Sequence, residues 1–145
     1  MKRIPELRDL SDDHHRGLVL ARKAKLASKS KDESLIANVW KEIKEKFISE
    51  LEPHFQIEEK FIAPNLAALG KVILLERFYT DHKILRKLIK SGSKKTSVEL
   101  HFVGVLLEKH IRFEERELFE EAQNYLSTDL LNSIAKASKE MNYNY

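Results

Sequence analysis

The sequence predicts an all-α fold: an up-down bundle of four helices with a short additional helix near the C-terminus. Leu, Lys, Glu, Ile and Ala dominate the 145 residues, whereas only 4 glycines and 3 prolines are present. Such a composition favours helix over strand. Apolar residues also recur at helical spacing in five segments of the chain. A chain of this length corresponds to a single domain, residues 1–145.

The first two helices are expected over residues 5–27 and 33–63. Pro5 suits the first turn of a helix, where its missing N–H is not needed. Pro53 lies inside the second segment, and the apolar pattern keeps its phase across it. We therefore expect one kinked helix there, with two separate helices as the alternative. The stretch from Pro64 to Gly70 is expected to form the next turn.

The remaining helices are expected over residues 71–90, 96–125 and 128–141. Gly92 suits a left-handed cap at the end of the third helix. Thr96 and Glu99 have the spacing of a capping box, which would open the fourth helix. The first four helices would form the core of the domain, about residues 5–126, and the last would be appended to it.

Charge and composition exclude several classes of function. The 26 basic and 23 acidic residues give a formal net charge of +3 and are largely interspersed, without the continuous basic stripe that nucleic-acid binding requires. No apolar run approaches the roughly 20 residues needed to cross a bilayer, and the first residues do not resemble a signal peptide. We expect no nucleic-acid or membrane partner and a cytoplasmic location. Because cysteine is absent, thiolate ligation is excluded for this chain.

One short phrase, His-x-x-x-Glu-Glu, begins at His54 and again at His110. Residues four apart lie on one face of a helix, so each phrase projects an imidazole and a carboxylate, Glu58 or Glu114, from the same stripe. Two such helices facing each other would supply two nitrogen and two oxygen ligands, a set that suits iron, manganese or zinc. His101 lies about 180° around the helix from His110 and is expected at the surface.

Two further histidines lie at a suitable depth. His82 occupies the middle of an apolar face of the third helix. At about 1.5 Å per residue from the connecting turns, it falls in one layer with His54 and His110. In the first helix, His14 lies near the centre of the buried face and is preferred as a ligand. His15 is the alternate, beside the site or at the surface.

The acidic residues of the two phrases carry two further expectations. Without metal, Glu58 and Glu114 are expected to raise their pKa and stay protonated, because burial penalises the charged form. Glu59 and Glu115, which follow them, are expected either to face solvent or to hold histidines in place. Apolar side chains are expected to enclose the site in a dry pocket, among them Phe55, Ile62, Phe78, Leu107 and Phe113.

The order His, His-x-x-x-Glu, His, His-x-x-x-Glu over four helices resembles the hemerythrin-like (HHE cation-binding) family. Three phrases carry the resemblance, which covers about residues 5–126: Asp13–Leu18, Pro53–Glu59 and His110–Glu115. The resemblance implies two irons bridged by carboxylates, with or without an oxo bridge, rather than manganese or zinc. The bridges would be Glu58 and Glu114, and the terminal ligands would be His14, His54, His82 and His110.

The third helix departs from the pattern of the oxygen-carrying members. They have a second histidine four residues from the first, whereas Phe78 and Arg86 lie at that spacing from His82. One ligand fewer makes the site more open or more nearly symmetric. We expect a non-haem di-iron protein that binds or senses oxygen or nitric oxide, or handles iron, rather than an ordinary enzyme. A di-iron peroxidase or oxidase acting on peroxide and a metal-free helical interaction module are the alternatives, and the sequence indicates no protein partner.

Overall fold

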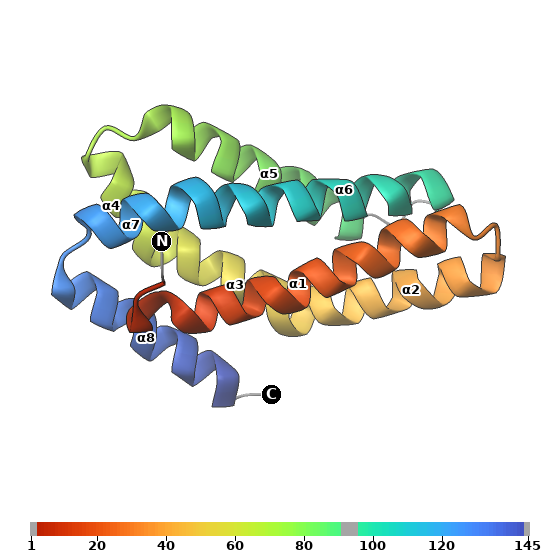
Figure 1. The fold of residues 1–145 in the computed structure, drawn as a ribbon, viewed down its shortest axis with the longest axis horizontal. Helices are drawn as coiled ribbons and strands as arrows, with labels where there is room; N and C mark the ends of the chain where they lie inside the picture. The colour runs from red at the N-terminus through yellow and green to blue at the C-terminus, as the bar shows by residue number, and fades with distance from the viewer. Residues whose placement is uncertain (1–2, 91–95, 144–145) are drawn as a thin grey trace.

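A computed structural model describes residues 3–90 and 96–143, and all of the regular structure in these ranges is helical (Figure 1). This confirms the all-α prediction. The α-helices are α1 (Pro5–Lys29), α2 (Glu33–Lys46), α3 (Glu52–Ile57), α4 (Ala63–Ala68), α5 (Val72–Lys90), α6 (Ser97–Phe113), α7 (Phe119–Tyr125) and α8 (Thr128–Tyr143). Three π-helical turns join some of them: η1 (Phe47–Leu51), η2 (Glu58–Ile62) and η3 (Glu114–Leu118).

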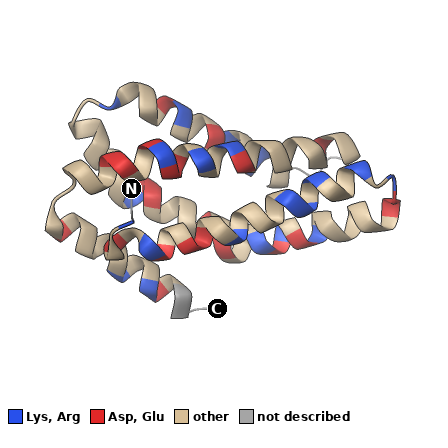
Figure 2. Ribbon diagram, in the orientation of Figure 1, with Lys and Arg blue, Asp and Glu red and all other residues tan. Residues whose placement is uncertain are grey.

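Four helical rods run alongside one another, and α8 crosses one end of the bundle (Figure 1). The first rod is α1, the second runs from α2 to α4, the third is α5, and the fourth is α6 with α7. Helix α8 packs against α1, α3 and η2. Acidic and basic residues are interspersed along the helices on the face seen in Figure 2. Among the described residues, no helix combines the length and the apolar character that crossing a bilayer requires.

Side-chain caps define where two of the rods begin. The Asp32 carboxylate accepts a hydrogen bond from the Leu35 N–H at 3.1 Å and opens α2. The Thr96 hydroxyl accepts one from the Glu99 N–H at 3.2 Å and opens α6, as the capping pattern predicts. The expected left-handed cap at Gly92 lies outside the described residues.

The second rod is helical through both of its prolines. The single helix expected across Pro53 is observed, but the predicted end near residue 63 is wrong, because the rod continues to Ala68. Each proline occupies one of the first positions of an α-helical segment that follows a π-turn, Pro53 after η1 and Pro64 after η2. A missing N–H costs least at such a position, which explains why Pro64 does not end the helix.

The polar layer described below separates two apolar clusters of the core. One cluster contains Trp40, Ile43 and Leu100, toward the end of the bundle where α1 meets α2. The other contains Leu7 and Leu66 at the opposite end and also includes Ile134 of α8. The appended helix therefore contributes to the core and covers this end of the bundle.

Helices α1 and α6 approach each other closely at Gly104. A Cβ added at Gly104 would lie 2.8 Å from the backbone oxygen of Ala21 and 3.1 Å from the Ala24 Cβ. Only a residue without a side chain allows this approach, and it fixes how α6, which carries His110, lies against α1, which carries His14.

We expect Gly104→Ala to lower the free energy of unfolding by about 1–3 kcal/mol, as overpacking does in other cores. Urea unfolding of the metal-free protein measures it. Gly17→Ala is the matched control, because the one close contact of its Cβ would be the movable end of the Ile111 side chain, at 2.7 Å, rather than backbone. Equal losses for the two variants would contradict the argument from backbone contact.

Candidate metal centre

The structure brings together the six residues that the sequence singled out as ligands. They are His14 in α1, His54 in α3, Glu58 in η2, His82 in α5, His110 in α6 and Glu114 in η3. The exposed fraction is 5% for His14 and no more than 2% for each of the other five. Together these six residues form one polar layer, which lies between the two apolar clusters.

These residues form two groups that share both glutamates. The first group is His14, His54, Glu58 and Glu114, and the second is His82, His110, Glu58 and Glu114. In each group the four ligand atoms all lie within 4.8 Å of one another. The arrangement therefore has room for two metal ions, with two histidines on each side and the two carboxylates between them.

Each glutamate offers one oxygen to each side. Glu58 places Oε2 at 3.1 Å from the His54 Nε2 and Oε1 at 3.4 Å from the His82 Nε2. Glu114 places Oε1 at 2.9 Å from the His14 Nε2 and Oε2 at 3.2 Å from the His110 Nε2. This is the disposition that two bridging carboxylates require.

The histidine nitrogens of each side face one another. The Nε2 atoms of His14 and His54 lie 3.1 Å apart, and so do those of His82 and His110. In addition, both oxygens of Glu58 and Oε2 of Glu114 are buried without a hydrogen-bond partner. Groups that are rich in lone pairs and buried without partners need a cation. The chemistry of the donor set therefore fits a pair of metal ions.

The other nitrogen of each imidazole, Nδ1, faces a second carboxylate. His54 donates to Asp13 and His110 donates to Asp81, both at 3.0 Å. The two remaining pairs are His82 with Glu59 at 2.6 Å and His14 with Glu115 at 3.3 Å. A carboxylate at Nδ1 keeps the proton on that atom and leaves Nε2 free to bind a metal.

Sequence reasoning missed Asp13 and Asp81. A signal was present, because each aspartate directly precedes a histidine of the layer and the dipeptide Asp-His is thus repeated. Of the two roles expected for Glu59 and Glu115, the structure shows the contact with histidine rather than exposure to solvent.

Both shared glutamates begin a π-turn, η2 at Glu58 and η3 at Glu114. A π-turn contains more residues than the 3.6 of an α-helical turn, so consecutive side chains diverge less. This geometry lets Glu58 enter the layer while its neighbour Glu59 reaches His82 of the other half. The same holds for the pair of glutamates in η3.

Aromatic rings pack on the imidazoles. Phe55 stacks on His82 with ring centroids 3.8 Å apart, and Phe119 stacks on His14 at 4.9 Å. All five apolar residues that were expected to enclose the site are buried, namely Phe55, Ile62, Phe78, Leu107 and Phe113. These contacts restrict rotation of the imidazole rings and exclude water from the layer.

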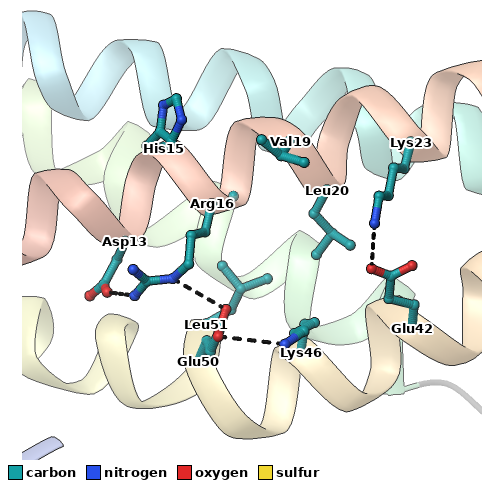
Figure 3. Close-up of a pocket in the computed structure, with 11 residues that line it drawn as sticks. Asp13, His15, Arg16, Val19, Leu20, Lys23, Glu42, Lys46, Glu50 and Leu51 are labelled. Atoms are coloured by element: carbon teal, nitrogen blue, oxygen red, sulfur yellow. Dashed lines mark hydrogen bonds and ion pairs between the residues drawn. The ribbon is translucent and has the colours of Figure 1, made fainter. Parts of the chain in front are cut away.

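The two adjacent histidines of α1 occupy different environments. His14 belongs to the buried layer, whereas His15 is exposed. His15 lines a pocket of about 340 Å³ between α1 and α2 and is turned away from the ion pairs of Asp13, Arg16 and Glu50 (Figure 3). His101 is exposed as expected and lies 3.4 Å from the Ser28 hydroxyl.

Charges within the layer determine its protonation in the absence of metal. Burial lowers the pKa of His82, but the nearby carboxylates of Glu114, Glu58 and Glu59 outweigh it and raise the pKa to about 10. Burial raises the pKa of Glu114, yet the charge of His110 and the close imidazoles of His14 and His82 bring it well below its usual 4.5. The expectation that Glu114 would stay protonated is therefore wrong, because positively charged imidazoles surround it.

Comparison with known protein families identifies a relationship for most of the chain. The family model of the hemerythrin HHE cation binding domain matches residues 6–122, which include all six residues of the layer and exclude α8. No curated protein and no solved structure matches the chain significantly.

The metal-free protein is expected to lose stability as the pH rises. The folded state holds the His82 proton more tightly than the unfolded chain does. The contribution of His82 to the free energy of unfolding is therefore complete below pH 6.5 and is lost as the pH approaches about 10. The contribution of Glu114 is lost in the other direction, as the pH falls below 4.5.

Urea unfolding in the presence of a chelator, across this range of pH, measures the effect. The free energy of unfolding should be greatest between about pH 4.5 and 6.5 and should decline above that range. In the His82→Gln variant the decline should be shallower. A free energy of unfolding that is constant from neutral to alkaline pH would contradict this account of the charges.

Proposed function

The chain belongs to the hemerythrin HHE cation-binding domain family, and from this premise we propose that it is a non-haem di-iron protein that binds or senses a small diatomic ligand, oxygen or nitric oxide. The observation that supports this most strongly is the pairing of buried imidazoles across two shared carboxylates. Each side of the layer presents two Nε2 atoms, at 3.1 Å from each other, and one oxygen from each glutamate.

The ligand types support iron as the metal. Imidazole nitrogen and carboxylate oxygen together suit iron, manganese and zinc, and the chain has no thiolate that would favour softer metals. Two anionic bridges between neutral nitrogen ligands also suit a pair of ions better than a single one, because each carboxylate then satisfies both of its oxygens. Iron is the metal that the family resemblance implies, and manganese or zinc would be held by the same atoms.

The burial of the layer supports a small ligand. None of the six residues is more than 5% exposed, and the rings of Phe55 and Phe78 pack on His82 at 3.8 Å and 4.2 Å. A bulky substrate would have to displace these rings, whereas a diatomic could pass between them during small fluctuations. Iron in this layer would supply vacant coordination positions, and the protein contributes oriented ligands and an apolar enclosure.

The positions that distinguish this chain from the oxygen-carrying members have other roles here. Arg86, four residues after His82, donates to Glu59 at 2.7 Å and to Glu52 at 2.8 Å. Phe78, four residues before His82, packs on the imidazole ring. Neither supplies a ligand, so the two halves have equal numbers of histidines. We propose that this equality leaves both metal positions open to an incoming ligand.

The first test is metal content. We expect close to two irons per chain after anaerobic loading, and a melting temperature that rises with iron because the folded state alone presents the ligands. His54→Ala and His110→Ala should each greatly weaken iron binding. His101→Ala is the matched control, since this exposed histidine of α6 lies away from the layer.

An iron content near zero in the parent protein would refute the metal centre. An equal loss of iron in His101→Ala and His110→Ala would show that the two faces of α6 have been assigned wrongly. Consumption of peroxide at a catalytic rate by the loaded protein would favour a peroxidase over a ligand-binding protein.

The second test removes the bridges. Glu58→Gln and Glu114→Gln keep the shape of the side chain and remove the anion, so each variant should lose the two-metal site while keeping its helical content. Metal analysis and circular dichroism measure these two properties. Glu117→Gln is the control, because this residue lies in the same π-turn as Glu114 and its side chain is 56% exposed. Full loading of either bridge variant with two irons would rule out bridging by that residue.

A further inference from the structure

An arginine stands behind each of the four carboxylates that face Nδ1 of a histidine. Arg16 pairs with Asp13, Arg77 with Asp81 at 3.8 Å, Arg86 with Glu59 at 2.7 Å, and Arg3 with Glu115 at 3.0 Å. Each histidine of the layer is thus the inner end of a chain that runs from imidazole to carboxylate to guanidinium. Three of these arginines belong to helices of the bundle, whereas Arg3 precedes α1, which begins at Pro5.

Arg3 connects the segment before α1 to η3 and α7 through an ion pair and hydrogen bonds. Its guanidinium pairs with the Glu115 carboxylate at 3.0 Å and donates to the Glu115 backbone oxygen at 2.8 Å and to the Gln123 side-chain oxygen at 3.0 Å. The Ile4 N–H donates to the same oxygen of Gln123, also at 3.0 Å. The side chain of Arg3 is only 15% exposed. These contacts are more numerous than those of an ordinary surface ion pair.

Two residues that Arg3 contacts also contact His14. Glu115 lies 3.3 Å from the His14 Nδ1, and the Phe119 ring stacks on the His14 imidazole at 4.9 Å. The Arg3 guanidinium also lies over the Phe119 ring, 5.5 Å from its centroid. Arg3 can therefore act on the orientation of His14 by two routes, although it does not touch the ligand itself.

The corresponding contacts of His82 are tighter and do not involve a chain end. His82 and Glu59 are 2.6 Å apart, and Arg86 donates to both oxygens of Glu59, at 2.7 Å and 3.2 Å. Phe55 stacks on the His82 ring at 3.8 Å. On the other side, the longer distance from His14 to Glu115 leaves the buried His14 Nδ1 without a hydrogen bond. The two sides have the same plan, and His54 and His110 lie at the same distance, 3.0 Å, from their carboxylates. The difference is between His82, which is held firmly, and His14, which is not.

We propose that Arg3 is a positioning residue for the His14–His54 side of the centre. Because His14 is held less firmly than His82, this side is the second to fill with metal. The His82–His110 side fills first and is independent of Arg3. This inference rests on the proposed metal-binding function. Outer partners of metal-binding histidines typically change metal affinity by about 10- to 100-fold. With Arg3 in place, Glu115 and Phe119 keep the His14 Nε2 directed at Glu114; without it, His14 must be ordered by the metal itself.

Zn²⁺ is a suitable probe because it is diamagnetic and takes imidazole and carboxylate ligands. The full chain, freed of metal, is titrated with Zn²⁺ while the imidazole nitrogen resonances are followed by NMR and affinities are measured by calorimetry. In the parent protein, the first equivalent should shift the resonances of His82 and His110, and the second should shift those of His14 and His54.

The decisive variant is Arg3→Gln. The affinity for the second equivalent should fall by about 10- to 100-fold, and the affinity for the first should not change. Arg8→Gln, at an exposed arginine of α1, is the matched control and should leave both affinities unchanged. Arg86→Gln, the counterpart on the other side, should lower the affinity for the Zn²⁺ equivalent that binds at His82 and His110.

A double-mutant cycle separates positioning from a general loss of structure. Because Arg3 acts through Glu115 as well as Phe119, the loss of affinity for the second equivalent in the variant with both Arg3→Gln and Glu115→Gln should be smaller than the sum of the two single losses. Additive losses would overturn the proposal, as would an equal weakening of both equivalents in Arg3→Gln, or no change in either. If the parent protein binds two equivalents and Arg3→Gln does not differ from it, only this inference fails. If the parent protein binds no metal, the proposed function fails with it.

Discussion

The rest of the structure follows from one constraint, namely that four imidazoles and two carboxylates are buried in a single layer between two apolar clusters. Water cannot satisfy these groups, so each must find its partners within the layer, in a metal ion or in a residue directly behind it. Each imidazole is paired at Nδ1 with a carboxylate, and each of these carboxylates is paired in turn with an arginine nearer the surface. Charge that would be costly in isolation is thereby distributed along chains of alternating sign.

The backbone adapts to the same constraint. Regular α-helix would direct two consecutive glutamates about 100° apart, and only one of them could serve the layer. The π-turns at Glu58 and Glu114 relax this limit, and η2 also precedes the segment in which Pro64 is accommodated. Irregular helical turns of this kind occur often at functional sites. Here they are explained by what the neighbouring side chains have to reach.

The spacing of residues in the sequence predicted much of the buried layer. The features that it missed depend on backbone irregularities or on contacts between helices. Helical spacing was enough to place His54 with Glu58 on one face and to direct His14, rather than His15, inward. Periodicity does not encode an i to i+5 turn, so the π-turns and the continuation of the helix past Pro64 were not foreseen. The low pKa of Glu114 could not be derived from burial alone, because it depends on His110 one turn earlier and on the imidazoles of His14 and His82, which two other rods bring to it.

The sharing of both glutamates has a consequence for how the bundle opens. The segments 5–62 and 72–118 are two helical hairpins, each of which carries a pair of histidines and one of the carboxylates. Under the proposed two-metal function, each ion would be held by oxygens from both hairpins, so the hairpins could separate only if both ions gave up a ligand. The rate at which the loaded bundle opens along this plane would then be set by ligand exchange at the ions rather than by the motion of its loops.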